Sequence, residues 1–200
     1  MIEKIINRKM LPLVCALIFF IVTLVTLKDY GPSWDEAVHF SRGQAYLNFF
    51  LTGKKDYSNV TGRRSFYQFD YHSGEYWFSQ NPGHPPLSDI FTALSNYIFY
   101  QKLGILGDID SYHLFNILVS SFLVFVVVDF AIITIGPGAA SISFLALATY
   151  PLFFAESHFN IKDPVETCFF GLTIYTFWKA IKNQSPKWMI SSAIFCGMAL

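Results

Sequence analysis

Long, nearly uninterrupted apolar blocks are the feature that most constrains how this chain of 200 residues can fold. A bilayer core of about 30 Å is crossed by roughly 20 consecutive apolar residues in a helix. The chain is 53% hydrophobic and only 14% charged, whereas soluble domains are about one quarter charged. We therefore predict an all-α fold, a polytopic transmembrane helix bundle, with spans at about 10–27, 112–135, 137–155 and 164–181. A last apolar block, 188–200, is too short to span, and we expect its helix to continue beyond Leu200.

The first block has the flanks of an uncleaved signal anchor. Lys4, Arg8 and Lys9 precede it, which places the N-terminus in the cytoplasm by the positive-inside rule. The polar segment 28–30 follows it, in place of the small residues of a cleavage site. A cleaved signal peptide is the alternative, although its apolar core is normally shorter.

The moderately apolar block at 86–103 decides the topology. If it spans, Lys179, Lys182 and Lys187 face outside, against the positive-inside rule. If it lies in the membrane interface, these lysines are cytoplasmic. Its polar residues suit an interfacial helix better than a span, and we favour that alternative.

Two loops then share the extracytoplasmic side of the membrane. One is a long first loop, 28–111, with interfacial helices at about 35–51 and 86–103. The other is the short loop 156–163. A site assembled from both loops would face the same compartment, outside the cytoplasm.

Charge and cysteine usage exclude other classes. The net charge is zero and no basic stretch is long, which argues against a nucleic-acid partner. Cys15, Cys168 and Cys196 lie in apolar blocks without metal or redox spacing, so we interpret them as small hydrophobic residues within helices.

Two adjacent acids, Asp35 and Glu36, follow the first span. Ser33 and Glu36 have the spacing of a capping box, which predicts that a helix begins there with Ser33 accepting the Glu36 N–H. A helix N-terminus favours a carboxylate over a carboxylic acid, so Asp35 is expected to be ionised. Either the acids only cap this helix, or, beside Trp34, they meet a polar ligand head at the bilayer surface.

The same helix is predicted to lie along the membrane. Its apolar residues fall near one face and its charged residues near another. The apolar set is Ala37, Phe40, Leu47, Phe50 and Leu51, and the polar set is Glu36, His39 and Arg42.

The rest of the long loop holds further candidate residues. His84, beside two prolines at the entrance of the second interfacial helix, is suited to bind a metal or a phosphate, or is structural. Arg63 and Arg64 match phosphate oxygens, with a solvated basic turn as the alternative. Asn59 begins a glycosylation sequon, which matters only where exported chains are glycosylated.

The short loop 156–163 is dense in polar chemistry. Asp163 before Pro164 has the pattern of a helix start, which is a sufficient structural reason for both. Polar groups near membrane depth are nevertheless costly unless they face a cavity or a partner. A carboxylate can act as general base on an acceptor hydroxyl, and a lysine or a cation can neutralise a departing phosphate. The polar residues are Glu156, His158, Asn160, Lys162 and Asp163.

Three motifs together resemble those of a known family. They are Trp34-Asp35-Glu36 after the first span, His84-Pro85-Pro86-Leu87 before a short helix, and Asn160-Ile161-Lys162-Asp163-Pro164 after the third span. In this order and spacing the chain resembles the superfamily C glycosyltransferases. Within them it resembles family 39, which comprises the protein O-mannosyltransferases and bacterial aminoarabinose- or mannosyl-transferring relatives.

The resemblance implies an enzyme that moves a hexosyl or pentosyl group, with inversion, from a polyprenyl-phosphate-linked donor to an acceptor lipid, glycan or protein. It implies a multi-pass protein of the cell (inner) membrane with an extracytoplasmic active site. Because such relatives carry more spans, we expect this stretch alone to be inactive.

The resemblance also assigns roles to residues. Asp35 would be the catalytic base with Glu36 beside it, and Asp163 the second essential acid. His84 would lie near the donor phosphate or a divalent metal ion, for which Glu36 is the other candidate ligand. We place Lys162 and His158 near the same phosphate.

Two other functional classes stay open at this point. A transporter or flippase-like protein is one, because Asn96, Asn116 and Asp129 are polar residues that can line a membrane pathway. A non-catalytic membrane scaffold, in which Asp35 and Asp163 only cap helices, is the other.

Overall fold

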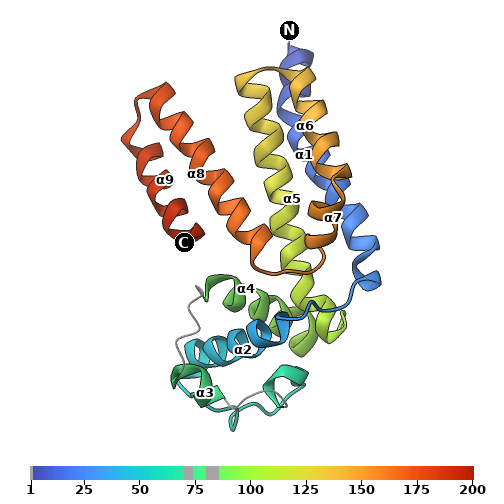
Figure 1. Ribbon diagram of the computed structural model, residues 1–200, viewed down its shortest axis with the longest axis vertical. Coiled ribbons are helices and arrows are strands. Elements are labelled where there is room, and N and C mark those ends of the chain that lie inside the picture. Colours follow the sequence, from blue (N-terminus) through green and yellow to red (C-terminus); the bar gives the residue numbers. More distant parts are fainter. Residues whose placement is uncertain (1, 70–73, 80–85) are drawn as a thin grey trace. The chain divides into compact units, whose positions relative to one another are not determined.

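The structure, a computed structural model, describes residues 2–69, 74–79 and 86–200 (Figure 1). Every regular element in these segments is a helix, so the predicted all-α class is confirmed. The chain divides into two compact units. The helical unit comprises everything before Leu27, together with Ile117–Ser157 and Asp163–Leu200, and the loop unit comprises Leu27–Asn116 and His158–Lys162.

The helical unit is built from apolar helices. They are α1 (Ile2–Val25), the part of α5 (Asp108–Thr134) from Ile117 onward, α6 (Pro137–Thr149), α7 (Pro151–Glu156), α8 (Asp163–Asn183) and α9 (Pro186–Ala199). One core joins α1, α5 and α6 through Phe19, Val124 and Ala140. The helices α8 and α9 lie side by side, and the Ser192 hydroxyl donates to the carbonyl of Thr173 at 3.0 Å (Figure 1).

Among the described helices, α5 is the one whose length and hydropathy suffice to cross a membrane. The apolar helical stretches Met10–Val25 and Pro137–Thr149 are shorter. The blocks predicted to span at 10–27, 112–135 and 164–181 correspond to α1, α5 and α8, and the shorter block 188–200 corresponds to α9. Their crossing of a bilayer, and the side on which each loop lies, remain predictions.

The block expected as one span at 137–155 forms two helices instead. The backbone of Tyr150 is extended, with ψ of 112°, and Pro151 begins α7. A residue before proline is pushed out of the helical region because the proline ring clashes with its backbone. The sequence Tyr150-Pro151 therefore ends α6 where the apolar pattern continues without interruption.

The loop unit contains shorter elements. They are η1 (Leu27–Asp29), α2 (Glu36–Thr52), η2 (Phe66–Gln68), α3 (Gly74–Ser79), α4 (Leu87–Asn96) and the π-helix η3 (Tyr97–Lys102). The helices expected at about 35–51 and 86–103 correspond to α2 and to α4 followed by η3. The core of the unit is formed by Phe40, Leu47, Tyr67, Ala93, Tyr112 and Ile161.

The two main helices of this unit, α2 and α4, approach each other closely at Gly43. A Cβ atom added to Gly43 would lie 2.2 Å from the backbone oxygen of Asp89 and 3.2 Å from the Ala93 methyl group. Only glycine lets the two backbones come this near. This approach brings polar side chains of α4 against the N-terminal half of α2.

Candidate functional site

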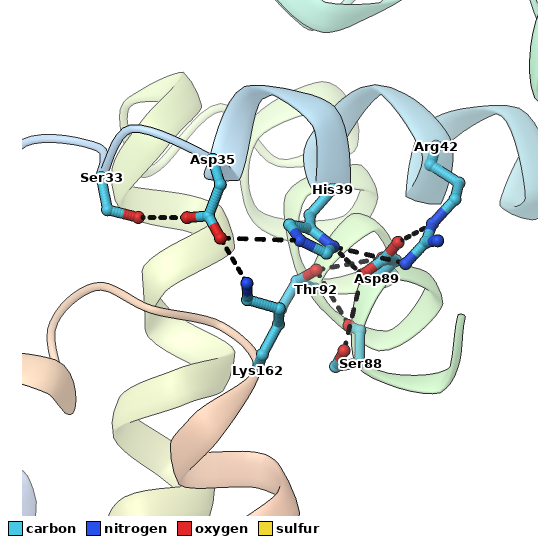
Figure 2. Close-up of polar contacts among 8 residues, drawn as sticks. All are labelled: Ser33, Asp35, His39, Arg42, Ser88, Asp89, Thr92 and Lys162. Atoms are coloured by element: carbon cyan, nitrogen blue, oxygen red, sulfur yellow. Dashed lines mark hydrogen bonds and ion pairs between the residues drawn. The ribbon is translucent and has the colours of Figure 1, made fainter. Parts of the chain in front are cut away.

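A cluster of charged side chains surrounds the N-terminus of α2 (Figure 2). The Asp35 carboxylate forms an ion pair with the Lys162 ammonium through Oδ2. Its other oxygen, Oδ1, accepts a hydrogen bond from the Ser33 hydroxyl at 3.2 Å. The Asp35 side chain is 45% exposed and that of Lys162 is 20% exposed, so both can be reached from solvent.

Although Asp35 occupies the N-cap position of α2, its side chain makes no capping hydrogen bond to the helix. The hydrogen bond from Lys162 holds the pKa of the Asp35 carboxyl below its ordinary value, with help from the lysine charge and the Ser33 hydroxyl. Asp35 is therefore an accessible, ionised carboxylate at neutral pH.

A second ion pair lies behind Asp35 and is buried. The Asp89 carboxylate on α4 pairs with the Arg42 guanidinium of α2, and the two side chains are 0% and 1% exposed. Burial of a charge is costly unless it is paired and hydrogen-bonded, and this pair meets both conditions. Asp89 thus ties α4 to α2 at the level of the site.

The imidazole of His39 lies between the two carboxylates. Its Nδ1 is 2.9 Å from Asp89 Oδ1 and its Nε2 is 4.0 Å from Asp35 Oδ2. The same Nδ1 lies 3.3 Å from Arg42 Nη2, so whether it donates to Asp89 or accepts from Arg42 depends on the tautomer. These contacts fix the orientation of the ring, and Nε2 faces Asp35.

Lys162 reaches Asp35 because the segment His158–Lys162 is docked into the loop unit. The His158 ring is fully buried and stacks on Tyr30 with centroids 4.1 Å apart. The Asn116 amide donates to the carbonyl of Phe159 at 2.8 Å, and Ile161 is fully buried in the core of the unit. These contacts hold the lysine backbone rigidly beside the N-terminus of α2.

Glu36 lies apart from this charged cluster, although it is adjacent to Asp35 in sequence. Its side chain is 1% exposed, and Oε2 accepts the Ser33 N–H at 2.6 Å and lies 3.2 Å from His113 Nε2. Only one half of the expected capping box forms, because the Ser33 hydroxyl donates to Asp35 instead of accepting the Glu36 N–H. Glu36 therefore anchors the start of α2 to α5.

The polar face predicted for α2 turns inward. Glu36, His39 and Arg42 are all buried. Of the predicted apolar set, Phe40 and Leu47 are buried, whereas Phe50 and Leu51 are exposed. Asp89 of α4 and His113 of α5 contact these three polar side chains, which lowers the cost of burying them. That this helix lies along a membrane stays a prediction.

The remaining predicted residues are distributed as follows. His84 lies outside the described residues. Asp163 is exposed at the first position of α8, in the helical unit. His158 is fully buried, and Glu156 is the last residue of α7.

Few side chains that could bind a metal ion lie close together in the part of the chain that the structure describes. No group of three or more His, Cys, Asp or Glu side chains comes together there in a way that could hold an ion. Glu36, one of the two candidate ligands, already has Oε2 engaged by Ser33 and His113. His84, the other candidate ligand, lies outside the described residues, so the metal that the resemblance implies stays a prediction.

Sequence reasoning missed Asp89 as a member of the site, and it missed His113 as the partner of Glu36. A usable signal was present on α4, whose polar residues recur at helical spacing within an apolar block and are all buried in the structure. These residues are Ser88, Asp89, Thr92, Ser95 and Asn96.

Comparison with known families places this geometry in context. The family model described as dolichyl-phosphate-mannose-protein mannosyltransferase matches residues 83–200, which is more than half of the chain. The chain belongs to this family of membrane glycosyltransferases. Searches of curated proteins and of solved structures gave no match. The matched segment contains Asp89, Lys162 and Asp163, whereas Asp35 precedes it.

Proposed function

We propose that the protein transfers a mannose-type sugar from a polyprenyl-phosphate-linked donor to an acceptor hydroxyl on the extracytoplasmic side of the membrane, with Asp35 as the base. The observation that carries this proposal is that Asp35 makes no capping bond to its own helix. Its carboxylate is ionised, half-exposed and paired with Lys162. A carboxylate whose role was only to cap the helix would accept hydrogen bonds from the backbone N–H groups of the first turn.

The chemistry is a single displacement that inverts the anomeric carbon. The acceptor oxygen attacks this carbon and forms the new glycosidic bond, while the bond from the carbon to the phosphate oxygen breaks. The acceptor proton passes to Asp35, and the electron pair leaves with the polyprenyl phosphate. A base on the face opposite the leaving group is what such an inversion requires.

Lys162 supports the base in this scheme. Its ammonium holds Asp35 ionised and directs the carboxylate. Because it pairs with the base, it lies on the acceptor side of the sugar, opposite the departing phosphate. A carboxylate of low pKa is a weak base at neutral pH, so it accepts the proton late, once the acceptor oxygen has begun to bond.

The buried pair behind Asp35 positions these groups and makes no contact with the reacting atoms. Asp89 orients His39, whose Nε2 faces the Asp35 carboxylate at 4.0 Å. This arrangement limits the rotation of Asp35 and keeps its oxygens directed toward Ser33 and Lys162.

The test is a transfer assay with the full-length protein in native membranes and a radiolabelled polyprenyl-phosphate-mannose donor. Asp35→Asn is expected to lower the rate by about 10²–10⁴-fold, the usual contribution of a general base. Asp29→Asn, which changes an exposed acid of the same unit, is the matched control and should leave the rate unchanged. Unchanged transfer in Asp35→Asn would overturn the proposal.

A further inference from the structure

The loop unit has a cavity that lies away from Asp35. It has a volume of about 370 Å³ and is lined by the C-terminal half of α2, the segment 59–63 and the π-helix η3. None of its lining residues belongs to the cluster around Asp35. Gln44, the first α2 residue in the lining, follows Asp35 by about 13 Å along the helix axis, at 1.5 Å per residue.

The floor of this cavity is a network of side-chain amides. The Gln44 carbonyl oxygen accepts from Gln68 Nε2 at 2.9 Å and from Gln101 Nε2 at 3.1 Å. The Gln44 amide nitrogen in turn donates to Asn96 at 3.1 Å and to the Tyr112 hydroxyl at 2.7 Å. Because each amide is fixed by its neighbours, the floor presents polar atoms in a set arrangement before any ligand arrives.

The π-helix creates the second wall of the cavity. Gln101 Nε2 donates to Asn96 Oδ1, five residues earlier, at 2.9 Å, and the backbone N–H of Leu103 donates to Ile98, also five residues earlier, at 3.0 Å. The wider turn brings Gln101 and Lys102 to the cavity together with Tyr97. Wide helical turns of this kind are rare and are often found at functional sites.

Among the described residues that line the cavity there are two cations, Arg63 and Lys102, and no carboxylate. The Arg63 guanidinium lies over the Tyr100 ring at 5.3 Å, and the Lys102 ammonium lies over the Tyr97 ring at 5.0 Å. Arg63 Nη1 also donates a long hydrogen bond to the carbonyl of Tyr100 at 3.5 Å, so the remaining N–H groups of its guanidinium are the ones that can contact a ligand. The neighbouring Arg64 does not line the cavity, and its guanidinium donates to the carbonyls of Val60 and Tyr57.

We propose that this cavity binds a sugar group that carries a phosphate or a carboxylate. The two cations would take the anionic group, while the amides, Thr52, Thr61 and the Tyr97 ring would take the hydroxyls and the face of the sugar ring. A volume of about 370 Å³ is larger than a lone phosphate needs and lies within the usual range of small-molecule sites. This inference does not depend on the transfer reaction proposed for Asp35.

The test measures binding by isothermal titration calorimetry to the full-length protein in nanodiscs of neutral lipid. The probes are glucose 6-phosphate, glucuronate, glucose and inorganic phosphate. We expect the two anionic sugars to bind more tightly than glucose and more tightly than phosphate. Arg63→Gln and Lys102→Gln should each weaken glucose 6-phosphate by about tenfold, as expected when a charge-assisted hydrogen bond is lost.

Lys55→Gln is the matched control, because Lys55 also lies over an aromatic ring, that of Phe78 at 5.1 Å, but does not line the cavity. It should bind glucose 6-phosphate like the unaltered protein. The proposal is overturned if inorganic phosphate binds as tightly as the hexose phosphate, if no probe binds, or if the Arg63→Gln, Lys102→Gln double variant keeps full affinity.

The same chemistry has two sources, a sugar of a soluble glycan and the headgroup of an anionic phospholipid. Repeating the titration in phosphatidylglycerol nanodiscs separates them. Retained glucose 6-phosphate binding supports a soluble acidic glycan. Glucose 6-phosphate binding that is weaker in phosphatidylglycerol nanodiscs than in neutral ones supports a lipid headgroup in the same cavity.

Discussion

The Lys162 ammonium pairs with the Asp35 carboxylate although 127 residues separate them in the sequence. The pair exists because the short segment from His158 to Lys162 packs into the loop unit and leaves only the end of the lysine side chain near solvent. The accessible carboxylate of Asp35 thus forms an ion pair with a lysine whose backbone is packed into the loop unit. This relationship leads to predictions that separate chemistry from folding.

The first prediction concerns the pH dependence of transfer. Lys162 lowers the pKa of Asp35 from its ordinary 3.8, so Lys162→Gln should let this pKa rise. The acid limb of the pH–rate profile, where Asp35 takes up its proton, should then move to higher pH. The rate at neutral pH should also fall, but by less than in Asp35→Asn, because Asp35 stays ionised and loses only the group that orients it. An acid limb at the same pH in Lys162→Gln and the unaltered protein would show that Asp35 does not carry the reaction.

The second prediction concerns the stability of Asp35→Asn, because a loss of transfer in this variant is informative only if the variant stays folded. Because the folded-state pKa of Asp35 is depressed, its ion pair stabilises the fold above the ordinary pKa, and this contribution is lost as pH falls through the depressed value. The pair is partly exposed and therefore contributes only about 0–1 kcal/mol. Thermal unfolding in detergent at pH 7 should give similar midpoint temperatures for the Asp35→Asn variant and the unaltered protein. A midpoint many degrees lower in Asp35→Asn would mean that its loss of transfer reports unfolding.

Much of the architecture could be predicted from periodicity and block length alone. The apolar blocks predicted the long helices, because a stretch long enough to cross a bilayer has few other ways to satisfy its backbone. The break at Tyr150 was missed, since hydropathy is continuous there and only the following proline marks the boundary. Pro151 indicated a helix boundary, but the prediction relied on the length of the apolar block and treated 137–155 as one span.

The site was only partly accessible to sequence reasoning. Asp35 and Lys162 were both singled out, but their contact depends on a docked segment that no periodicity encodes. Asp89 was missed because a polar residue in a moderately apolar block was taken to face the membrane interface. It is instead buried against Arg42, a pairing that becomes evident only when α2 and α4 are placed side by side.

The third prediction tests that buried pair. Asp89→Ala removes the partner of Arg42 and leaves a buried guanidinium without its counter-charge, which typically costs 3–5 kcal/mol, so we expect about that loss. The double variant Arg42→Met, Asp89→Ala should recover part of the stability, because no lone charge is then buried. Chemical denaturation followed by fluorescence measures both. An Asp89→Ala protein as stable as the unaltered one would show that Asp89 does not hold α4 against α2.

The last prediction tests the close approach of α2 and α4 at Gly43. The methyl group of Gly43→Ala would meet the backbone oxygen of Asp89 at 2.2 Å, and a backbone atom cannot move aside as a flexible side chain can. The helices must separate, which costs about 1–3 kcal/mol as in other overpacked cores.

Separation of the two helices would also displace Asp89 from His39 and Arg42, so transfer should fall together with stability. Gly31→Ala is the control, because a Cβ atom there meets nothing within 4 Å. Thermal unfolding and the transfer assay are run on both variants. Full activity and full stability in Gly43→Ala would contradict the close approach and, with it, the alignment of Asp89 behind Asp35.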